Sequence, residues 1–295
     1  MMRYGERPMA KTILVTGATG KVGRDVVRLL SERGAPIRVG VRDQAKAREQ
    51  FGDDIVLVTF DFENEDSFAS ALDGVAKVFL LTPSRPNQVE VTNAFVDAAK
   101  RAGVCHIVKL SVIGIDDSPQ FTFGEWHAAN EQHIRESGLA FTFLRPNSFM
   151  QNFITFFSPR NGAIHLPWGS GKASFVDTRD IASVAAEVLM SDGHDEKIYT
   201  LTGPAALGIA DVARILSEAV RREFKYVDVP ESAARDAMLQ VGMPTWAVDG
   251  LMELHAINKQ NHWSAVTSDI ERVTGSPATD FAQFARDHAE RFRVG

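Results

Sequence analysis

The sequence predicts an α/β fold: a doubly wound parallel sheet with helices on both faces, followed by a smaller, mainly helical C-terminal region. Two observations predict it. Short apolar, β-branched runs alternate with longer amphipathic stretches, which is the order that a parallel sheet with crossover helices requires. The chain also has 295 residues, 44% hydrophobic and 24% charged, which is enough to bury a large core.

Each predicted strand is a short and nearly continuous apolar run, as expected when helices cover both faces of a sheet. The runs lie at residues 12–16, 37–41, 55–60, 77–81, 106–111 and 140–144. A further strand is predicted at residues 197–201.

The amphipathic stretches predict the helices. In the first half they lie at residues 22–33, 88–102 and 127–137, and Gly103 and Gly138 end the last two. Later helices are predicted at residues 179–190, 209–222, 231–241, 246–258 and 281–292. Asp177 is expected to cap the first of these later helices, with Asp180 in its first turn.

These elements predict the domain organisation. Residues 1–8 are polar and are expected to form a disordered extension outside the fold. Residues 9–150 form the sheet domain, and residues 151–295 form a smaller region, of which about 174–203 pack back on the sheet. Residues 158–171 are rich in Gly, Pro and Asn, which predicts a loop.

A glycine-rich turn joins the first predicted strand to the first helix. It has G-x-x-G-x-x-G spacing and reads Gly17-Ala18-Thr19-Gly20-Lys21-Val22-Gly23. Glycines here permit a tight turn and bring backbone N–H groups close to a pyrophosphate at the helix N-terminus. The turn therefore predicts a Rossmann domain that binds NAD(P), although the glycines could also serve packing alone.

The end of the second strand selects the cofactor. Arg42 suits a 2′-phosphate and Lys46 follows one helical turn later, so NADP(H) is favoured over NAD(H). Asp43 could instead bind a ribose 2′-hydroxyl, and Arg42 could be a solvated charge. By analogy with related folds, Asp61 and Phe62 are expected to meet the adenine, although Asp61 could equally be an exposed loop residue. Further cofactor contacts are expected at Thr82, Pro83, Ser111, Pro146 and Asn147.

Motifs along nearly the whole chain carry a family resemblance. The glycine turn, Lys109-Leu110-Ser111 and residues 175–182 and 199–204 match, and the most specific piece is Arg145-Pro146-Asn147-Ser148-Phe149-Met150-Gln151-Asn152. The chain resembles the NmrA-like branch of the atypical short-chain dehydrogenase/reductase family. That branch includes type 2 quinone reductases, triphenylmethane dye reductases and NADP-sensing regulators.

The resemblance also exposes a departure in the catalytic residues. Orthodox members of the superfamily use Ser with Tyr-x-x-x-Lys, in which the tyrosine donates a proton as hydride arrives. None of the three tyrosines here has lysine four residues later, and Phe123 and His127 stand where that pair should fall. Phenylalanine cannot donate a proton, so orthodox alcohol dehydrogenation is not expected.

His127, Ser111 and Glu131 are the candidate catalytic residues. The His127 imidazole can donate a hydrogen bond to substrate or nicotinamide ribose, and Glu131, one turn later, could orient that ring or raise its pKa. Ser111 is expected to line the nicotinamide site. The alternatives are a half-exposed helical pair and an ordinary strand-end hydroxyl. His127 and His133 point to different helix faces, so no metal site is expected.

The resemblance implies that the segment after Arg145-Pro146 forms the substrate wall. The expected substrate contacts are Phe149, Met150, Asn152, Phe153 and Trp168. An aromatic wall favours flat acceptors such as quinones or dyes. The same residues could equally form the core of the smaller region.

Two functions fit these features. One is an NAD(P)H-dependent oxidoreductase that passes hydride to a conjugated acceptor, and the other is a redox sensor that acts through a protein partner without turnover. An isomerase or lyase is a third alternative. The net charge of −6 gives no attraction to nucleic acid or membranes. One cysteine and no long apolar run predict a cytoplasmic protein, and a homodimer is compatible with the sequence.

Overall fold

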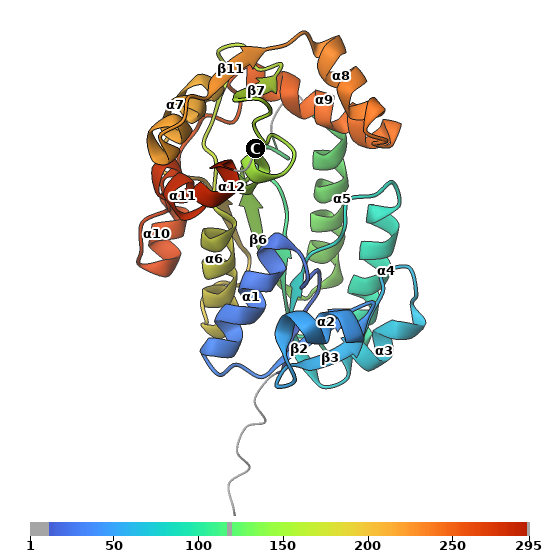
Figure 1. Cartoon of the computed structure of the whole chain (residues 1–295). Helices are drawn as coiled ribbons and strands as arrows, with labels where there is room; N and C mark the ends of the chain where they lie inside the picture. The colour runs from blue at the N-terminus through green and yellow to red at the C-terminus, as the bar shows by residue number, and fades with distance from the viewer. Residues whose placement is uncertain (1–11, 117–119, 294–295) are drawn as a thin grey trace, which may run out of the picture.

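The computed structural model describes residues 12–116 and 120–293, so the predicted extension at residues 1–8 lies outside the described residues. A parallel sheet of seven strands, in the order β3-β2-β1-β4-β5-β6-β9, forms the centre of the molecule (Figure 1). Its strands are β1 (Thr12–Val15), β2 (Ile37–Val41), β3 (Val56–Thr59), β4 (Val75–Leu80), β5 (His106–Leu110), β6 (Ala140–Pro146) and β9 (Lys197–Leu201).

The strand order reverses at β1. The chain passes from β1 outward through β2 to β3, and then returns to the other side of β1 with β4. In doubly wound sheets of this kind, ligands bind outside the carboxyl ends of the strands at the point of reversal. We therefore expect a ligand site at the edge of the sheet where β1 and β4 end.

Helices cover both faces of the sheet (Figure 1). On one side lie α1 (Lys21–Glu32) and α6 (Thr178–Met190), and on the other lie α3 (Asp66–Leu72), α4 (Gln88–Arg101) and α5 (Thr122–Ser137). The short helix α2 (Gln44–Phe51) connects β2 to β3. Asp177 caps α6 by accepting a hydrogen bond from the Arg179 N–H at 2.9 Å, as the sequence predicts.

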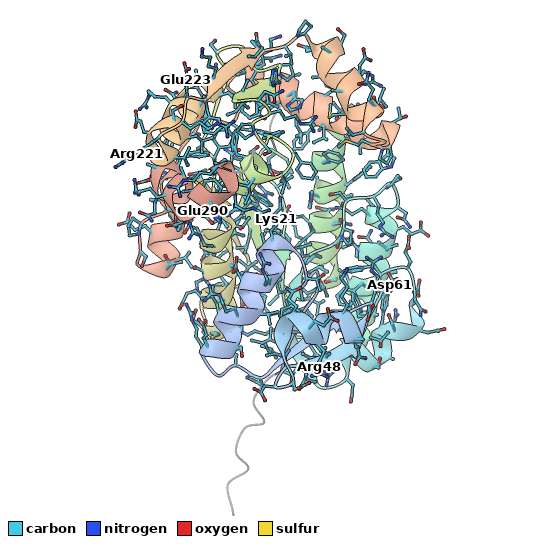
Figure 2. The ribbon with its side chains drawn as sticks, in the orientation of Figure 1. Lys21, Arg48, Asp61, Arg221, Glu223 and Glu290 are labelled. Atoms are coloured by element: carbon cyan, nitrogen blue, oxygen red, sulfur yellow. The ribbon has the colours of Figure 1, made fainter. Side chains whose placement is uncertain are left out.

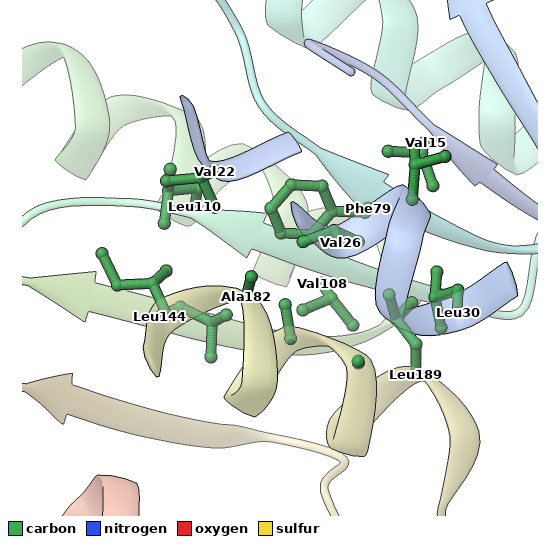
Figure 3. Packing of buried hydrophobic residues seen from close by; sticks show 14 of the residues in the cluster. Val15, Val22, Val26, Leu30, Phe79, Val108, Leu110, Leu144, Ala182 and Leu189 are labelled. Atoms are coloured by element: carbon green, nitrogen blue, oxygen red, sulfur yellow. The ribbon is translucent and has the colours of Figure 1, made fainter. Parts of the chain in front are cut away.

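Helices α1 and α6 pack on the sheet through their apolar faces. Val22, Val26 and Leu30 of α1 are each no more than 2% exposed, and with Ala182 and Leu189 of α6 they meet strand residues (Figure 3). Apolar residues at i, i+4 and i+8 lie on one helix face, so burial of that face fixes α1 against the sheet. The phosphate-binding turn that precedes α1 is thereby held in place.

The C-terminal region builds a second core above the carboxyl edge. Two small sheets pair β7 (Ala163–Leu166) with β11 (Lys225–Asp228) and β8 (Lys172–Ala173) with β10 (Leu207–Gly208). The remaining elements are η1 (Met150–Ile154), α7 (Ile209–Val220), α8 (Glu231–Gln240), α9 (Thr245–Lys259), α10 (Asp269–Thr274), α11 (Phe281–Asp287) and α12 (Ala289–Arg293). Because α6 and β9 lie on the main sheet, the chain passes repeatedly between the two parts, and a domain boundary at residue 150 stays a prediction.

All seven predicted strands are present, within two residues at each end. Several helices differ from the sequence prediction. Helix α5 begins at Thr122 instead of residue 127, the predicted helix 281–292 is two helices, and the predicted loop 158–171 contains β7. The short helices α2, α3 and α10 are not predicted at all. Within residues 12–116 and 120–293, no helix is long and apolar enough to cross a membrane.

Candidate functional site

The glycine-rich turn lies at the carboxyl end of β1, where the strand order reverses. Gly17 has φ +61°, a conformation that side chains rarely allow, and a Cβ on Gly23 would lie 2.3 Å from the Gly17 carbonyl oxygen. Thr16 ties the turn to β4, since its hydroxyl accepts from the Leu81 N–H at 2.9 Å. The turn therefore needs both glycines, and it aims the first N–H groups of α1 outward, where they can bind an anion.

A cavity of about 390 Å³ begins at this turn and extends over β2 and β3. This volume is in the usual range of small-molecule sites. Its lining residues are Gly17, Ala18, Thr19, Gly40, Val41, Arg42, Asp43, Lys46, Ala47, Gln50, Phe60, Asp61, Phe62, Pro83 and Arg85. The lining contains many of the predicted cofactor residues.

Basic side chains line the end of this cavity beside α2. Arg42 and Lys46 are both exposed, and in the part of the chain that the structure describes neither side chain has an acidic partner. Asp43 has a different role, because its carboxylate caps α2 by accepting from the Lys46 N–H at 3.0 Å. The cavity therefore presents two unpaired positive charges, suited to an anionic group.

Of the other predicted cofactor residues, some line the cavity and one lies outside its lining. Asp61, Phe62 and Pro83 line the cavity, and Phe62 also packs edge-on against Phe60 at 4.8 Å between ring centroids. Thr82 lies outside the cavity lining and accepts a hydrogen bond from the Thr92 hydroxyl at 3.0 Å.

Lys21 reaches from the glycine turn to the C-terminal region. Its ammonium donates to the Thr155 hydroxyl at 3.0 Å and lies 5.3 Å from the centre of the exposed Phe156 ring. Figure 2 labels Lys21 at the end of α1 that faces this region. Partial burial lowers the pKa of Lys21. The residue that could meet a bound phosphate thus also contacts the segment after η1.

A lysine and a histidine form the centre of the second part of the site. Lys109 on β5 is 1% exposed, and its Nζ lies 2.7 Å from Nδ1 of His127 on α5 and 3.1 Å from the Leu110 carbonyl oxygen. Burial lowers the pKa of Lys109 to about 7, with Arg145 acting in the same direction and Glu131 opposing it. Burial, and secondly Lys109, lowers the pKa of His127 well below its usual value, so the imidazole is neutral near pH 7.

The predicted partnership between Glu131 and His127 is wrong. Glu131 is 2% exposed and accepts two hydrogen bonds from Arg145, at 2.6 and 3.0 Å. Arg145 in turn donates to Asp116 at 2.5 Å. A guanidinium matches a carboxylate in a forked geometry, so Arg145 engages Glu131, and Lys109 takes the place at the imidazole.

Ser111 follows β5 directly and lies at the same edge of the sheet as His127. Its side chain is 5% exposed, and its hydroxyl has no hydrogen-bond partner within residues 12–116 and 120–293. A buried hydroxyl without a partner is unfavourable unless something else bonds it. Ser111 and His127 therefore both have hydrogen-bonding capacity available for a ligand, although no hydrogen bond joins them to each other.

Part of the predicted substrate wall lies in the protein core. Met150, Phe153 and Trp168 are at most 1% exposed and pack in the core of the C-terminal region, and the Trp168 indole donates to His255 at 2.8 Å. These side chains have no surface to offer a substrate, so we do not retain them as substrate contacts. Phe149 and Asn152 keep part of their surface exposed.

Three predicted cofactor residues also have structural roles. The Asn147 amide donates to the Ser174 hydroxyl and to the Trp263 carbonyl, both at 2.8 Å, so its side chain is already engaged. The Pro146 carbonyl accepts from the Ile113 N–H at 3.1 Å. The Val22 side chain is 2% exposed and buried under α1, which leaves only its backbone to contact a cofactor.

The comparison with family models decides the family. The model described as the NmrA-like family matches residues 9–288. The chain belongs to the NmrA-like family. An NAD(P)H azoreductase of Xenophilus azovorans is 41% identical to it over 282 residues, which cover 95% of this chain and 99% of that protein.

Solved structures agree with this NmrA-like assignment. The triphenylmethane reductase of Citrobacter sp. complexed with NADP(H) superposes with a TM-score of 0.83 at 25% identity, covering 94% of this chain and 99% of that one. The NADPH-dependent quinone oxidoreductase of Escherichia coli complexed with NADPH gives 0.84 at 27% identity, covering 93% and 99%. The seven-stranded Rossmann-like sheet with its helical C-terminal region is therefore the fold of these reductases.

In this NmrA-like chain Phe123, which stands where the resemblance leads us to expect the orthodox tyrosine, packs against α9. The Phe123 ring lies over Gly250 of α9, where an added Cβ would come within 2.5 Å of the ring. The neighbouring Thr122 donates its N–H to Glu253 of α9 at 2.7 Å. Phe123 therefore fastens the start of α5 to the C-terminal region.

Lys109 is absent from the site residues predicted from the sequence, although the motif Lys109-Leu110-Ser111 is part of the family resemblance. The signal was present, because a charged residue stands at the fourth of the five buried positions of the strand His106-Ile107-Val108-Lys109-Leu110. A fully buried lysine needs a partner or a lowered pKa. Its partner comes from α5, and periodicity alone does not reveal that pairing.

Proposed function

We propose that this chain uses NADPH to reduce a flat, conjugated acceptor such as an azo dye or a quinone, with His127 as the proton donor. The chain is an NAD(P)H-dependent reductase of the NmrA-like family. The observation that carries the proposal is the pair of neighbouring sites on one edge of the sheet. One is the glycine-turn cavity with unpaired cations, and the other holds the neutral His127 imidazole on α5 and, directly after β5, the buried Ser111 hydroxyl without a partner among the described residues.

The residues of the cavity fit a dinucleotide. The Gly17–Gly23 turn would hold the pyrophosphate on the N–H groups at the start of α1. A side chain at Gly17 or Gly23 would collide with Leu81 or with the turn itself, so only glycine allows this turn. Asp61 and Phe62 would lie against the adenosine part. When bound, the reduced nicotinamide supplies a hydride.

Three side chains support NADPH over NADH. Arg42 and Lys46 have no acidic partner among the described residues and line the cavity. Asp43, which could bind a ribose 2′-hydroxyl, uses one of its two carboxylate oxygens to cap α2. A 2′-phosphate would therefore meet two cations without acidic partners, whereas the carboxylate next to them is already partly engaged.

His127 and Ser111 act on the acceptor. A conjugated acceptor delocalises the charge that arrives with a hydride, so one modest proton donor is enough and the missing tyrosine is tolerated. His127 donates that proton and Ser111 bonds the acceptor or the carboxamide. Phe149 and Asn152, which are partly exposed, complete the wall around the acceptor.

The test is turnover by the purified protein. With NADPH and a panel of azo dyes and quinones, the nicotinamide absorbance should disappear together with the colour of the dye. His127→Ala should lower kcat by about 10²-fold while NADPH still binds, because a general acid is lost. Tight NADPH binding with no turnover of any acceptor would overturn the reductase function and favour the sensor.

The single cysteine, Cys105, supports a cytoplasmic setting for this chemistry.

A further inference from the structure

Lys109 occupies a place where a charge is costly. The residue is 1% exposed in the middle of the sheet, and its register neighbours, Leu80 on β4 and Phe143 on β6, are apolar. Burying an ammonium group is unfavourable unless hydrogen bonds and charges compensate. A purely structural position would be filled better by an apolar residue, so the lysine needs another explanation.

The surrounding charges leave Lys109 with one side-chain partner. Glu131 on α5 faces it but is held by both hydrogen bonds from Arg145, which also binds Asp116. Arg145 on β6 is a second positive charge near the ammonium. Of the described side chains, only His127 lies within hydrogen-bonding distance of Lys109 Nζ.

The contact fixes the hydrogen on the imidazole. While Lys109 is protonated, its ammonium donates hydrogen bonds and accepts none, so Nδ1 of His127 must then accept. In a neutral imidazole the other nitrogen then carries the hydrogen. Nε2 has no partner among the described residues, and His127 keeps part of its surface exposed. The Nε2–H group is therefore available to a ligand.

We propose that Lys109 is a positioning residue that holds His127 as the Nε2–H tautomer and replaces the proton that His127 donates. The proposal rests on the proposed function, in which His127 protonates the acceptor. The buried strand and the 2.7 Å contact supply its geometry.

The proton transfers balance. The Nε2–H bond breaks and the proton goes to the oxygen or nitrogen of the acceptor that has taken the hydride. A proton moves from Lys109 Nζ to Nδ1, which leaves a neutral imidazole with Nδ1–H and a neutral amine. After the product departs, solvent protonates Nε2 and Nδ1 returns its proton to Lys109. Hydroquinone or hydrazine is the product, and the enzyme is restored.

The first test needs neither cofactor nor turnover. The ¹⁵N spectrum of histidine-labelled wild-type protein at pH 6 should show His127 with Nδ1 unprotonated and Nε2 protonated. Between pH 6 and 8, the Nδ1 shift should move with an inflection near 7 as Lys109 deprotonates. An Nδ1–H tautomer at pH 6, or a flat titration, would overturn the proposal without any variant having to fold.

The second test separates proton transfer from charge. In single turnovers at saturating NADPH, the wild-type rate should fall as pH rises above about 7. Lys109→Met should lower the rate at pH 6 on the order of tenfold and lose this pH dependence. Lys109→Arg keeps a donor to Nδ1 but does not release its proton, so its rate should also stay low. If Lys109→Arg turned over at the wild-type rate, the proposal that Lys109 supplies a proton to His127 would be refuted.

Lys77 provides a matched control. It is a lysine of the neighbouring strand β4, in register with His106 at the other end of β5, and its ammonium donates to the Leu189 carbonyl at 2.8 Å. Lys77→Met should keep the wild-type pH dependence, and loss of that dependence would show a general charge effect and overturn the proposal. Absence of wild-type turnover refutes the proposed function itself. Normal turnover with a wild-type pH profile in Lys109→Met refutes only the role of Lys109.

Discussion

Neighbouring residues at the end of β2 show how local bonding decides which side chain is free for a ligand. Arg42 and Asp43 are adjacent in sequence and both line the cavity. Asp43 accepts a backbone hydrogen bond at the start of α2, whereas Arg42 has no partner among the described residues. The sequence left the choice between these residues open, because a capping role depends on where the helix begins.

Arg42→Ala should weaken NADPH binding by about 10- to 100-fold, since a charge-assisted contact to a phosphate is worth about 1.5–3 kcal/mol. NADH has no 2′-phosphate, so its affinity should change little. Dissociation constants of both nucleotides, measured by fluorescence titration, check the prediction.

Arg28→Ala is the control for a lost surface arginine. Arg28 lies on α1 outside the cavity lining and pairs with Glu32 at 3.0 Å, with its side chain half exposed. Both nucleotides should bind this variant as they bind wild type. An equal loss of NADPH and NADH affinity in Arg42→Ala would contradict the proposed 2′-phosphate contact.

Residue types alone predicted the candidate site unevenly. The glycine turn and Arg42 could be proposed from local spacing next to a strand, and Gly17 and Arg42 both line the cavity. Glu131 was assigned to the wrong partner, because Arg145, which engages it, comes from another strand. The sequence could not decide whether Trp168 contacts the substrate or packs in the core, because an aromatic side chain suits both positions.

Helix α5 depends on α9 for its N-terminus. Phe121 provides no side-chain cap, and Glu253 accepts from both the N–H and the hydroxyl of Thr122, at 2.7 and 3.1 Å. This contact spans 131 residues of sequence. It explains why the sequence placed the start of α5 too late, whereas the buried strands were predicted from their own apolar runs.

Glu253→Ala should destabilise the protein by about 1–2 kcal/mol, because the first turn of α5 loses its cap. Urea unfolding measures the loss, and hydrogen exchange should show faster exchange at the start of α5. Glu231→Ala is the control, since this carboxylate on the neighbouring α8 pairs with Lys259 at the surface and its loss should cost less than about 1 kcal/mol. Equal effects of the two substitutions would contradict the capping role.

At the scale of the whole molecule, two buried histidines make stability depend on pH. Burial lowers the pKa of His106 and of His255 to about 4. The unfolded chain binds these protons near pH 6.5 and the folded chain does not. The free energy of unfolding therefore keeps its full value, as far as these two histidines are concerned, above pH 6.5. It decreases as pH falls toward 4, because the unfolded chain then binds protons that the folded chain does not.

His255→Gln isolates one of these contributions. Glutamine keeps an acceptor for the Trp168 indole but does not titrate. The loss of stability between pH 6.5 and 4 should shrink by on the order of 3 kcal/mol, and denaturant unfolding across that window measures it. His165→Gln, which replaces an exposed histidine of β7, is the control for the substitution itself. A wild-type slope in His255→Gln would refute the assignment.

Strand β9 has a consequence for how the protein is synthesised. It hydrogen-bonds to β6 as the last strand of the sheet, yet it follows β6 by about fifty residues that build much of the upper core. During synthesis, the edge of β6 that later pairs with β9 therefore stays unpaired until β9 has been made. Unpaired strand edges can pair with other chains and lead to aggregation. A nascent chain that stalls in this interval would be a natural client for chaperones.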